Sequence, residues 1–467
     1  MPPAAVRSAA AGGCACSGRR GTDPGEAAHE QTPGTAEAKI KALYDCVMDT
    51  DGREKAGVAP IQKYLDAIEN AATLNELVAA DVTMQQELGL STLLGFGLTA
   101  DLADPSRKTT AFSLIGAGMG KDFYANGTDA QKAAYSTYLT TLLTLSGLSG
   151  DEAARRAALA YVDEYFSAAA KADVEEMIGE FISIYKERIL AQDRISAETK
   201  ARLQKLDTMG IKVGYPDSWD TYLDTVELQS PAEGGSFFSN VIAIQRAAKA
   251  ETLAHQNDAP DKREWIMTPY TVNACYDPTA NDITFPAAIL QAPLYDVNAS
   301  REEDLGGIGY IIAHEITHAF DNNGAKFDEN GSAADWWTAE DYAAFQQRCQ
   351  AVAQWYDGQE AYPGIACSGV LTVSENVADL GSARCIVAAA KKLDDPDFDK
   401  LFRAVANTWA STTSRQMREY LAVADVHGPD KLRCNRVLQT LPEFYETYGI
   451  RPGDGMWTDP ASRVSVW

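Results

Sequence analysis

The chain has 467 residues, 45% of them hydrophobic, and a formal net charge of -25. At roughly 150 residues per domain, this length predicts two to four domains with a sizeable buried core. Phosphate backbones and anionic lipids repel an acidic chain that has no cluster of Lys or Arg, so we expect no nucleic-acid partner. The sequence has no run of about 18 apolar residues, so we expect no membrane span.

Residues 1–35 are rich in Ala and Gly and lack the apolar stretch of about 7 to 15 residues that a signal peptide needs, which predicts a disordered tail. The string "AAAGGC", ending at Cys14, is similar to a degenerate lipoprotein cleavage box, a pattern that such tails also produce by chance. The compartment therefore stays open between the cell envelope, secretion and the cytoplasm. The eight cysteines form no C-x-x-C pair, which argues against a zinc ribbon and a disulfide scaffold.

From residue 36 onward the sequence shows amphipathic helices separated by Gly, Pro or Asn, which predicts a mainly α fold. Segments 129–166 and 171–190 repeat apolar residues at helical spacing and predict core-facing helices. In segment 265–289, β-branched and aromatic residues flank a Pro/Asn turn, which predicts two short strands or a hairpin. This segment would be the small β element of the fold.

The string "YIIAHEITHAFDNNG", residues 310–324, contains the pattern H-E-x-x-H, which is expected by chance fewer than about 0.01 times in this composition. The i, i+4 spacing puts His314 and His318 on one face of an apolar helix. Buried imidazoles need partners, and a metal ion would supply both, with Glu315 placed to take a proton from a metal-bound water. A histidine pair satisfied by hydrogen bonds within the core is the alternative.

A second helix, "TVSENVADLGSARCIVAAAKK" at 372–392, carries Glu375 and Asp379 four residues apart on one face. A catalytic zinc usually takes three protein ligands and keeps one position for water, so a third ligand is needed. Buried carboxylates need a cation or hydrogen-bond donors, which makes this helix a candidate. The alternative is a Glu at the start of a helix and a solvated Asp.

Four strings resemble the neprilysin-like (M13) family of zinc endopeptidases in order and spacing: "VNACYDPTANDITFPAAILQAPL", "HEITHAFDNNGAKFDENG", "SENVADLGSA" and "DVHGPDKLR". The resemblance covers residues 176–467 and implies a two-lobed zincin, with a thermolysin-like catalytic lobe there and a helical lid lobe at 36–175. The lid lobe is expected to be reduced, because a middle portion of the family pattern has no counterpart. The implied activity is zinc-dependent cleavage of oligopeptides on the amino side of hydrophobic residues, by a monomer with one Zn²⁺ per chain.

The resemblance also implies roles for the residues of the two helices. Zinc would be held by His314, His318 and Glu375, with Glu315 as the general base. Asp321 and Asp379 would orient the two imidazoles, as metal-bound histidines commonly require. Asp321 fits this role from its position as well, three residues after His318 on the same face.

Further residues are implied to act on the substrate. His427 resembles the family's histidine that donates a hydrogen bond to the oxyanion, and Arg433 resembles the arginine that binds a substrate backbone carbonyl. Asn273 and Ala274 match an edge-strand pair that grips the peptide main chain. Without this context, a histidine in a loop such as His427 is more often a plain surface residue, and the alternative for Arg433 is a surface salt bridge.

The implied hydrophobic pocket for the residue after the cut consists of Ile289, Leu294, Tyr310, Ile311 and Trp409, each of which is equally well explained as core. Cys275 stands where the family has an aromatic residue and Leu294 where phenylalanine is common, so a wider pocket is expected. Ser382 replaces the second of two glycines. Cys349 matches a position that forms a disulfide in animal relatives, but the C-terminal "SRVSVW" has no cysteine to pair with it.

Two other functions stay open at this point. A reduced lid lobe is compatible with a zinc-binding pseudopeptidase or a peptide-binding module, which would hold metal without turnover. An aminopeptidase-like zinc enzyme would need a carboxylate that anchors a free amino terminus, and peptides with blocked ends would then resist cleavage.

Overall fold

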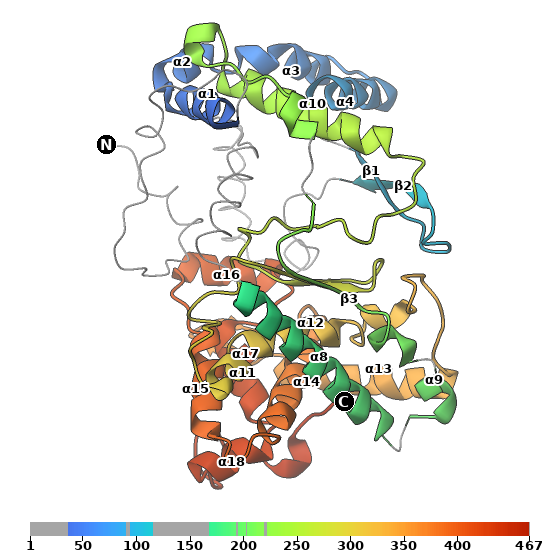
Figure 1. The fold of residues 1–467 in the computed structure, drawn as a ribbon, viewed down its shortest axis with the longest axis vertical. Helices are drawn as coiled ribbons and strands as arrows, with labels where there is room; N and C mark the ends of the chain where they lie inside the picture. The colour runs from blue at the N-terminus through green and yellow to red at the C-terminus, as the bar shows by residue number, and fades with distance from the viewer. Residues whose placement is uncertain are drawn as a thin grey trace.

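The computed structural model describes residues 36–89, 94–114, 168–192, 195–201, 203–218 and 222–466. These residues form an upper and a lower lobe (Figure 1). The predicted tail at 1–35, with Cys14, and the predicted helix at 129–166 lie outside the described residues. Within the described ranges, no helix combines the length and the apolarity that crossing a bilayer requires.

The upper lobe is a layer of helices. It contains α1 (Ala36–Met48), α2 (Thr50–Ala56), α3 (Gln62–Glu69), α4 (Leu74–Leu88) and α10 (Phe237–Ala254), with short 3-10 turns at Ala59–Ile61, Tyr222–Thr225 and Pro231–Glu233. A capping box of Thr73 and Glu76 starts α4, and Gly89 ends it in the left-handed region at φ 72°. Two small apolar clusters hold these helices together: Tyr64, Leu88 and Ile242, and Leu223, Val226 and Ile244.

The lower lobe is larger and built around one core. Its helices are α8 (Ala168–Leu190), α9 (Ala197–Ala201), α11 (Arg301–Gly306), α12 (Ile308–His318), α13 (Ala339–Tyr356), α14 (Val373–Ala390), α15 (Phe398–Thr408), α16 (Arg415–Ala424), α17 (Asp430–Leu438) and α18 (Pro442–Tyr448), with 3-10 turns at Leu203–Leu206, Gly324–Lys326 and Pro460–Ser462. Its strands are β3 (Gly210–Gly214), β4 (Cys275–Asp277), β5 (Asp282–Pro286), β6 (Glu360–Tyr362) and β7 (Ile365–Ala366). The predicted mainly α fold with a small β element is confirmed, and the helix predicted at 171–190 is α8.

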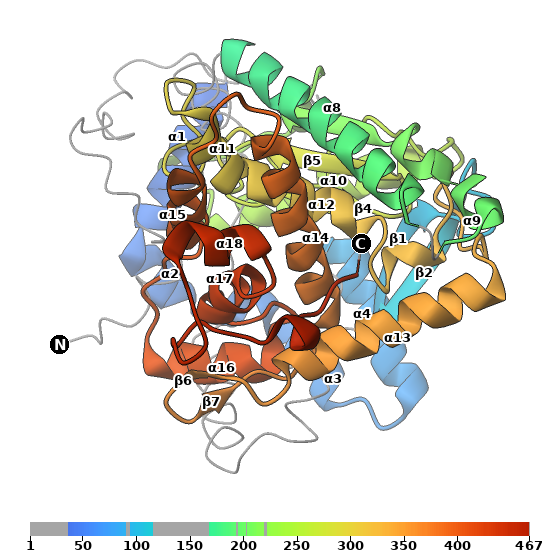
Figure 2. The same cartoon turned by 90° about the horizontal axis from the view of Figure 1, so that it is seen from below.

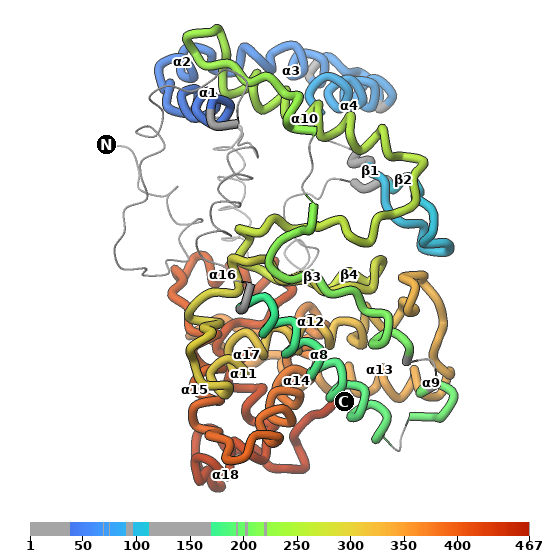
Figure 3. Tube along the Cα trace, viewed as in Figure 1, coloured from blue at the N-terminus to red at the C-terminus, as the bar shows by residue number. Residues whose placement is uncertain are grey.

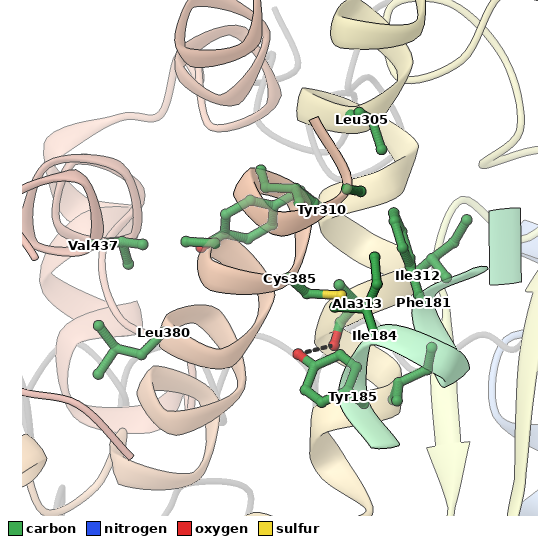
Figure 4. Packing of buried hydrophobic residues seen from close by; sticks show 14 of the residues in the cluster. Phe181, Ile184, Tyr185, Leu305, Tyr310, Ile312, Ala313, Leu380, Cys385 and Val437 are labelled. Atoms are coloured by element: carbon green, nitrogen blue, oxygen red, sulfur yellow. Dashed lines mark hydrogen bonds between the residues drawn. The ribbon is translucent and has the colours of Figure 1, made fainter. Parts of the chain in front are cut away.

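Helix α12 lies at the centre of this core. In Figure 2, α8 runs above the α12–α14 pair and α13 below it. Figure 4 shows Tyr185 of α8 beside Ala313 of α12, whose carbonyl accepts a hydrogen bond of 3.1 Å from the Tyr185 hydroxyl. At Gly381 of α14, an added Cβ would lie 2.7 Å from the side chain of Thr317. Only glycine therefore lets α14 approach α12 this closely.

The small sheet has the strand order β3-β5-β4. Strands β4 and β5 pair antiparallel as the predicted hairpin, whose turn contains Asn281 at φ 53°. Strand β3, which pairs parallel to β5, was not predicted. Strand β4 is an edge of this sheet, and among the described residues no strand pairs with the outer side of its backbone.

A second hairpin connects the lobes. Strands β1 (Leu94–Ala100) and β2 (Lys108–Leu114) pair antiparallel and reach from the upper lobe toward the lower one (Figure 3). Near its tip, the carbonyl of Leu102 accepts a hydrogen bond of 2.8 Å from the backbone N–H of Ala333 in the lower lobe. The two lobes therefore touch directly at this hairpin.

The packing of two helices departs from the predicted division into 36–175 and 176–467. Helix α10 follows this boundary in the sequence, yet Ile242 and Ile244 bury their side chains in the upper clusters. Helix α8 begins before the boundary, yet its Val174 is fully buried in the lower core. Each helix belongs to the lobe whose core buries its apolar face. The chain therefore returns to the upper lobe at α10.

Candidate active site

Helix α12 brings three polar side chains into the core of the lower lobe. His314 and Glu315 are buried, at 4% and 6% exposure, and the His318 side chain is 16% exposed. The Nε2 atoms of the two histidines lie 3.0 Å apart. The i, i+4 spacing therefore points both imidazoles at one place, as the sequence predicted.

The first turn of α14 adds a carboxylate at the same place. Glu375 Oε2 lies 3.1 Å from His314 Nε2 and 3.5 Å from His318 Nε2. Helix α14 packs against α12, so Glu375 is only 9% exposed. This packing places its carboxylate next to the two imidazoles. Three groups from two helices thus converge.

Carboxylates behind the two imidazoles determine which ring nitrogens carry protons. His314 Nδ1 lies 2.8 Å from Asp379 Oδ1, and His318 Nδ1 lies 2.7 Å from Asp321 Oδ2. An ionised carboxylate only accepts hydrogen bonds, so each Nδ1 donates, and in the neutral imidazole each Nε2 then keeps a lone pair.

In the neutral imidazoles, the two Nε2 lone pairs and the Glu375 oxygen face one another and offer three ligand atoms to a cation. A tetrahedral zinc ion with bonds of about 2.0 to 2.1 Å would separate its ligand atoms by about 3.3 Å. The observed separations of 3.0, 3.1 and 3.5 Å match this value. Imidazole nitrogens suit zinc better than magnesium or calcium, which favour oxygen ligands. The residues present therefore fit a zinc ion.

Asp379 is held from a second direction by Arg433 of α17. The guanidinium donates from Nε to Asp379 Oδ2 and from Nη2 to Oδ1, both at 2.8 Å. Burial alone would raise the pKa of Asp379, but Arg433 and His314 lower it to about 2. The guanidinium also stacks 3.8 Å from the ring centre of Trp409. Asp379 is therefore ionised and fixed in orientation.

Asp321 is held by the turn that follows α12. Its Oδ1 accepts hydrogen bonds of 2.7 Å from the backbone N–H groups of Asn323 and Gly324. Its Oδ2 accepts from Ser374 as well as from His318. Sequence reasoning missed Ser374, although it directly precedes Glu375, because a serine beside a motif has no distinctive spacing of its own.

Besides Glu375, Glu315 also brings a carboxylate close to the two imidazoles. One of its oxygens, together with one nitrogen from each of His314 and His318, forms a group whose atoms all lie within 4.8 Å of one another. Glu375 approaches both imidazoles more closely, so it is the better third ligand on geometry. Glu315 then lies beside the metal position as a base would.

His427 reaches the same centre from the loop before α17. Its Nε2 lies 3.3 Å from Glu375 Oε2, and its Nδ1 lies 2.7 Å from Asp425 Oδ1. The side chain is 46% exposed. A cavity of about 270 Å³ opens here, and its lining includes His427, Arg433, Arg418 and Tyr362. The structure thus brings His427 to the open side of the site.

The edge strand lies beside Glu315. Asn273 is exposed and Ala274 is buried, and both directly precede β4. Burial and the charge of Glu315 raise the pKa of the Cys275 thiol to about 12. The outer edge of the sheet β3-β5-β4 therefore borders the predicted base.

The five predicted pocket residues are packed against the core. Tyr310 is fully buried and Ile289 is 6% exposed, while Leu294, Ile311 and Trp409 are partly buried. The ring centres of Tyr310 and Trp409 lie 5.6 Å apart, edge to face. This packing suits both a pocket wall and plain core, so the pocket stays a prediction. Cys349, which was expected to form no disulfide, is a buried free thiol.

Comparisons with known proteins point to one peptidase family. Family models described as Peptidase family M13 match residues 273–464, 23–160 and 157–216. The chain is similar to the neutral endopeptidase of Lactococcus lactis subsp. lactis (strain IL1403), with 39% identity over 310 residues, or 66% of this chain and 49% of the relative. It is also similar to the neutral endopeptidase of Lactobacillus helveticus, with 37% identity over 308 residues, or 66% of this chain and 47% of the relative. The chain thus spans about half the length of these relatives.

Solved structures show the same fold. A crystal structure of the Mycobacterium tuberculosis zinc metalloprotease Zmp1 in complex with an inhibitor aligns with a TM-score of 0.80 and 23% identity, covering 95% of this chain and 90% of that one. PepO from Lactobacillus rhamnosis HN001 aligns with a TM-score of 0.79 and 24% identity, covering 92% and 91%. The predicted two-lobed zincin fold is consistent with both.

Proposed function

The chain belongs to peptidase family M13, and on this premise we propose that it is a zinc-dependent endopeptidase that hydrolyses oligopeptides. One observation carries the proposal: His314 Nε2, His318 Nε2 and Glu375 Oε2 converge with separations of 3.0 to 3.5 Å. These three residues are the proposed ligands of one Zn²⁺ per chain. The neutral endopeptidases to which the chain is similar support the activity.

The remaining polar residues have proposed roles in catalysis. When bound, zinc supplies a Lewis acid that activates water and polarises the scissile carbonyl. Glu315 accepts a proton from the attacking water and returns it to the departing amine. Asp379 and Asp321 keep His314 and His318 in the tautomer that leaves Nε2 free to coordinate.

His427 is proposed to stabilise the oxyanion. Asp425 accepts from its Nδ1 at 2.7 Å and from its backbone N–H at 2.9 Å, which orients the ring. The Nε2 then points to the metal position, where Glu375 Oε2 lies 3.3 Å away. A donor preorganised at that point stabilises negative charge that develops on the carbonyl oxygen.

Substrate binding is proposed to use the edge strand. A peptide main chain would pair with the backbone at Asn273 and Ala274, which gives affinity with little demand on sequence. Arg433 uses Nε and Nη2 to bind Asp379, and we assign its Nη1 to a substrate carbonyl. The proposed pocket of Ile289, Leu294, Tyr310, Ile311 and Trp409 would favour cleavage on the amino side of hydrophobic residues.

Two substitutions of the same kind test the proposal. Glu375→Gln exchanges a ligand carboxylate for an amide, and Glu315→Gln does the same to the proposed base. Glu446→Gln, at an exposed position of α18, serves as the matched control. Each protein is assayed for bound zinc, and the cuts that it makes in a mixed peptide library are mapped by mass spectrometry.

The proposed roles give a different result for each variant. Wild type and the control should bind one zinc and cut the library, and chelation should abolish cutting. Glu315→Gln should keep zinc and lose about 10² to 10⁴ in kcat. Glu375→Gln should lose zinc. Wild-type protein that holds zinc without cutting any peptide would instead establish the pseudopeptidase alternative.

A further inference from the structure

Lys205 is a buried amine that the catalytic roles above do not use. It lies on the 3-10 turn Leu203–Leu206 and is 2% exposed. Its Nζ donates to the carbonyl oxygen of Ala319 at 2.9 Å and to that of Gly324 at 2.7 Å. Both acceptors lie just beyond the C-terminal end of α12, the helix that carries the histidines.

The two acceptors bracket the turn that holds Asp321. Within this turn, the backbone N–H groups of Asn323 and Gly324 donate to Asp321 Oδ1, and the N–H of Ala325 donates to the Asp321 carbonyl at 2.9 Å. An added Cβ at Gly324 would lie 1.8 Å from the carbonyl oxygen of His318. The turn therefore folds back tightly on the end of α12, and Lys205 clamps it on both sides of Asp321.

The surroundings of Lys205 make its hydrogen bonds costly to lose. Its Nζ lies 5.5 Å from the ring centre of Tyr276 and 6.0 Å from that of Phe320. A buried carbonyl that loses its donor destabilises the fold, because no water replaces the lost hydrogen bond. The last carbonyls of a helix have no partner within the helix, and a lysine is a favourable cap for them. Both a charged and a neutral amine have enough hydrogens for the two bonds.

We propose that Lys205 is a positioning residue for the metal centre. By clamping Ala319 and Gly324, it holds the Asp321 carboxylate at 2.7 Å from His318 Nδ1 and so directs His318 Nε2 at the ion. This inference rests on the proposed zinc site. If it is correct, part of the zinc affinity depends on Lys205, which lies far from the histidines in the sequence.

The same segment also holds the edge strand in place. The carbonyl of Lys205 accepts a hydrogen bond of 3.0 Å from Asn281 Nδ2, in the turn between β4 and β5. Asn281 Oδ1 in turn accepts one of 3.0 Å from the Tyr276 hydroxyl on β4. The 3-10 turn that carries Lys205 therefore holds both the end of α12 and the edge strand that is proposed to bind the peptide.

The test measures zinc affinity rather than turnover. Lys205→Met keeps the length of the side chain and removes the donor, and Lys400→Met, at an exposed position, is the control. Competition with a chromogenic chelator should show zinc binding about 10-fold weaker in Lys205→Met and unchanged in the control. The visible spectrum of the cobalt-loaded protein should also shift, because His318 no longer has one orientation. If Lys205→Met is unfolded by circular dichroism, Lys205→Gln replaces it.

A double variant separates positioning from general stability. If Lys205 acts through Asp321, adding Lys205→Met to Asp321→Asn should weaken zinc binding by less than about 2-fold beyond Asp321→Asn alone. Independent, additive effects would overturn the inference, as would an unchanged zinc affinity in Lys205→Met. Wild-type protein that binds no zinc would overturn the proposed function as well, so the two failures are distinguishable.

Discussion

The two lobes differ in how their cores are built. The lower lobe has one continuous apolar core that extends from Ala170 to Val466 in the sequence. Helices α12, α14 and α17, which carry or adjoin the proposed catalytic residues, all contribute side chains to it. The upper lobe has two clusters of three buried residues each among its described residues. A large core can bury polar groups and hold them in one geometry, whereas small clusters open more easily. We therefore expect chemistry to depend on the lower lobe, and the upper lobe to be the less stable part.

The largest effect on stability is expected at Asp379. Asp379→Asn leaves Arg433 buried without its carboxylate, which costs about 3 to 5 kcal/mol when a buried pair loses one partner. Denaturant unfolding followed by tryptophan fluorescence reports this lobe, because Trp337 and Trp409 pack against its core. Asp395→Asn, at an exposed site, is the control. A loss below about 1 kcal/mol would show that the ion pair contributes little to this core.

His427→Ala is expected to affect turnover without destabilising the lobe. Loss of the donor to the oxyanion should lower kcat by about 10² to 10³, with KM little changed. Because the side chain is 46% exposed, the unfolding free energy should stay within about 0.5 kcal/mol of wild type. Arg433→Lys, which keeps a positive charge beside Asp379 but lacks the Nη1 assigned to the substrate, should instead chiefly raise KM. Steady-state kinetics on one peptide measure kcat and KM for both variants. A raised KM for the His427 variant and a lowered kcat for the Arg433 variant would mean that the two roles are exchanged.

A matched pair of substitutions compares the cores directly. Ile178→Ala in α8 and Ile242→Ala in α10 remove the same atoms from side chains that are 0% and 5% exposed. Such substitutions cost about 2 to 5 kcal/mol, and we expect the lower value for Ile242, where fewer neighbours pack. Hydrogen exchange should show opening confined to the upper lobe in Ile242→Ala, with zinc affinity unchanged. Equal costs would contradict the proposed difference between the lobes.

A smaller effect is expected at Asp341, which ties α13 to the segment before α9. Burial alone would raise its pKa, but hydrogen bonds from Ser196, Thr199 and Thr338 lower it to about 2. A carboxyl whose folded pKa is depressed stabilises the fold above its unfolded pKa of about 3.9, and this contribution disappears as pH falls toward 2. Asp341→Asn should cost about 1 to 2 kcal/mol at pH 7 and only about 0.4 kcal/mol at pH 2, as measured by thermal unfolding across pH. A difference at pH 2 as large as the one at pH 7 would exclude this ionisation as the cause.

The smallest expected effect concerns substrate length. The resemblance predicts a shortened upper lobe, and fewer helices enclose less volume above the cleft. We therefore expect an unfolded protein substrate to be cut at least as readily as a ten-residue peptide, once size-exclusion chromatography shows a defined species. A strict preference for the short peptide would indicate a closed chamber.

Short-range features were predictable from sequence, because helical and strand periodicity fix them. These include α12 with its histidine pair, Asp321 three residues after His318, and the hairpin of β4 and β5. Periodicity shows which face of a helix is buried but not what it meets. Sequence alone contains no signal for contacts that join distant segments. These are the pairing of Arg433 with Asp379, the parallel strand β3 and the clamp by Lys205.

The position of the metal ion is the most direct test of the site. Anomalous diffraction from crystals of the zinc-loaded protein, collected on both sides of the zinc absorption edge, locates the ion without reference to activity. We expect one peak about 2.0 to 2.2 Å from His314 Nε2, His318 Nε2 and a Glu375 oxygen, with Glu315 outside bonding distance. A peak bonded to Glu315 instead of Glu375, or no peak between the two imidazoles, would contradict the proposed mechanism.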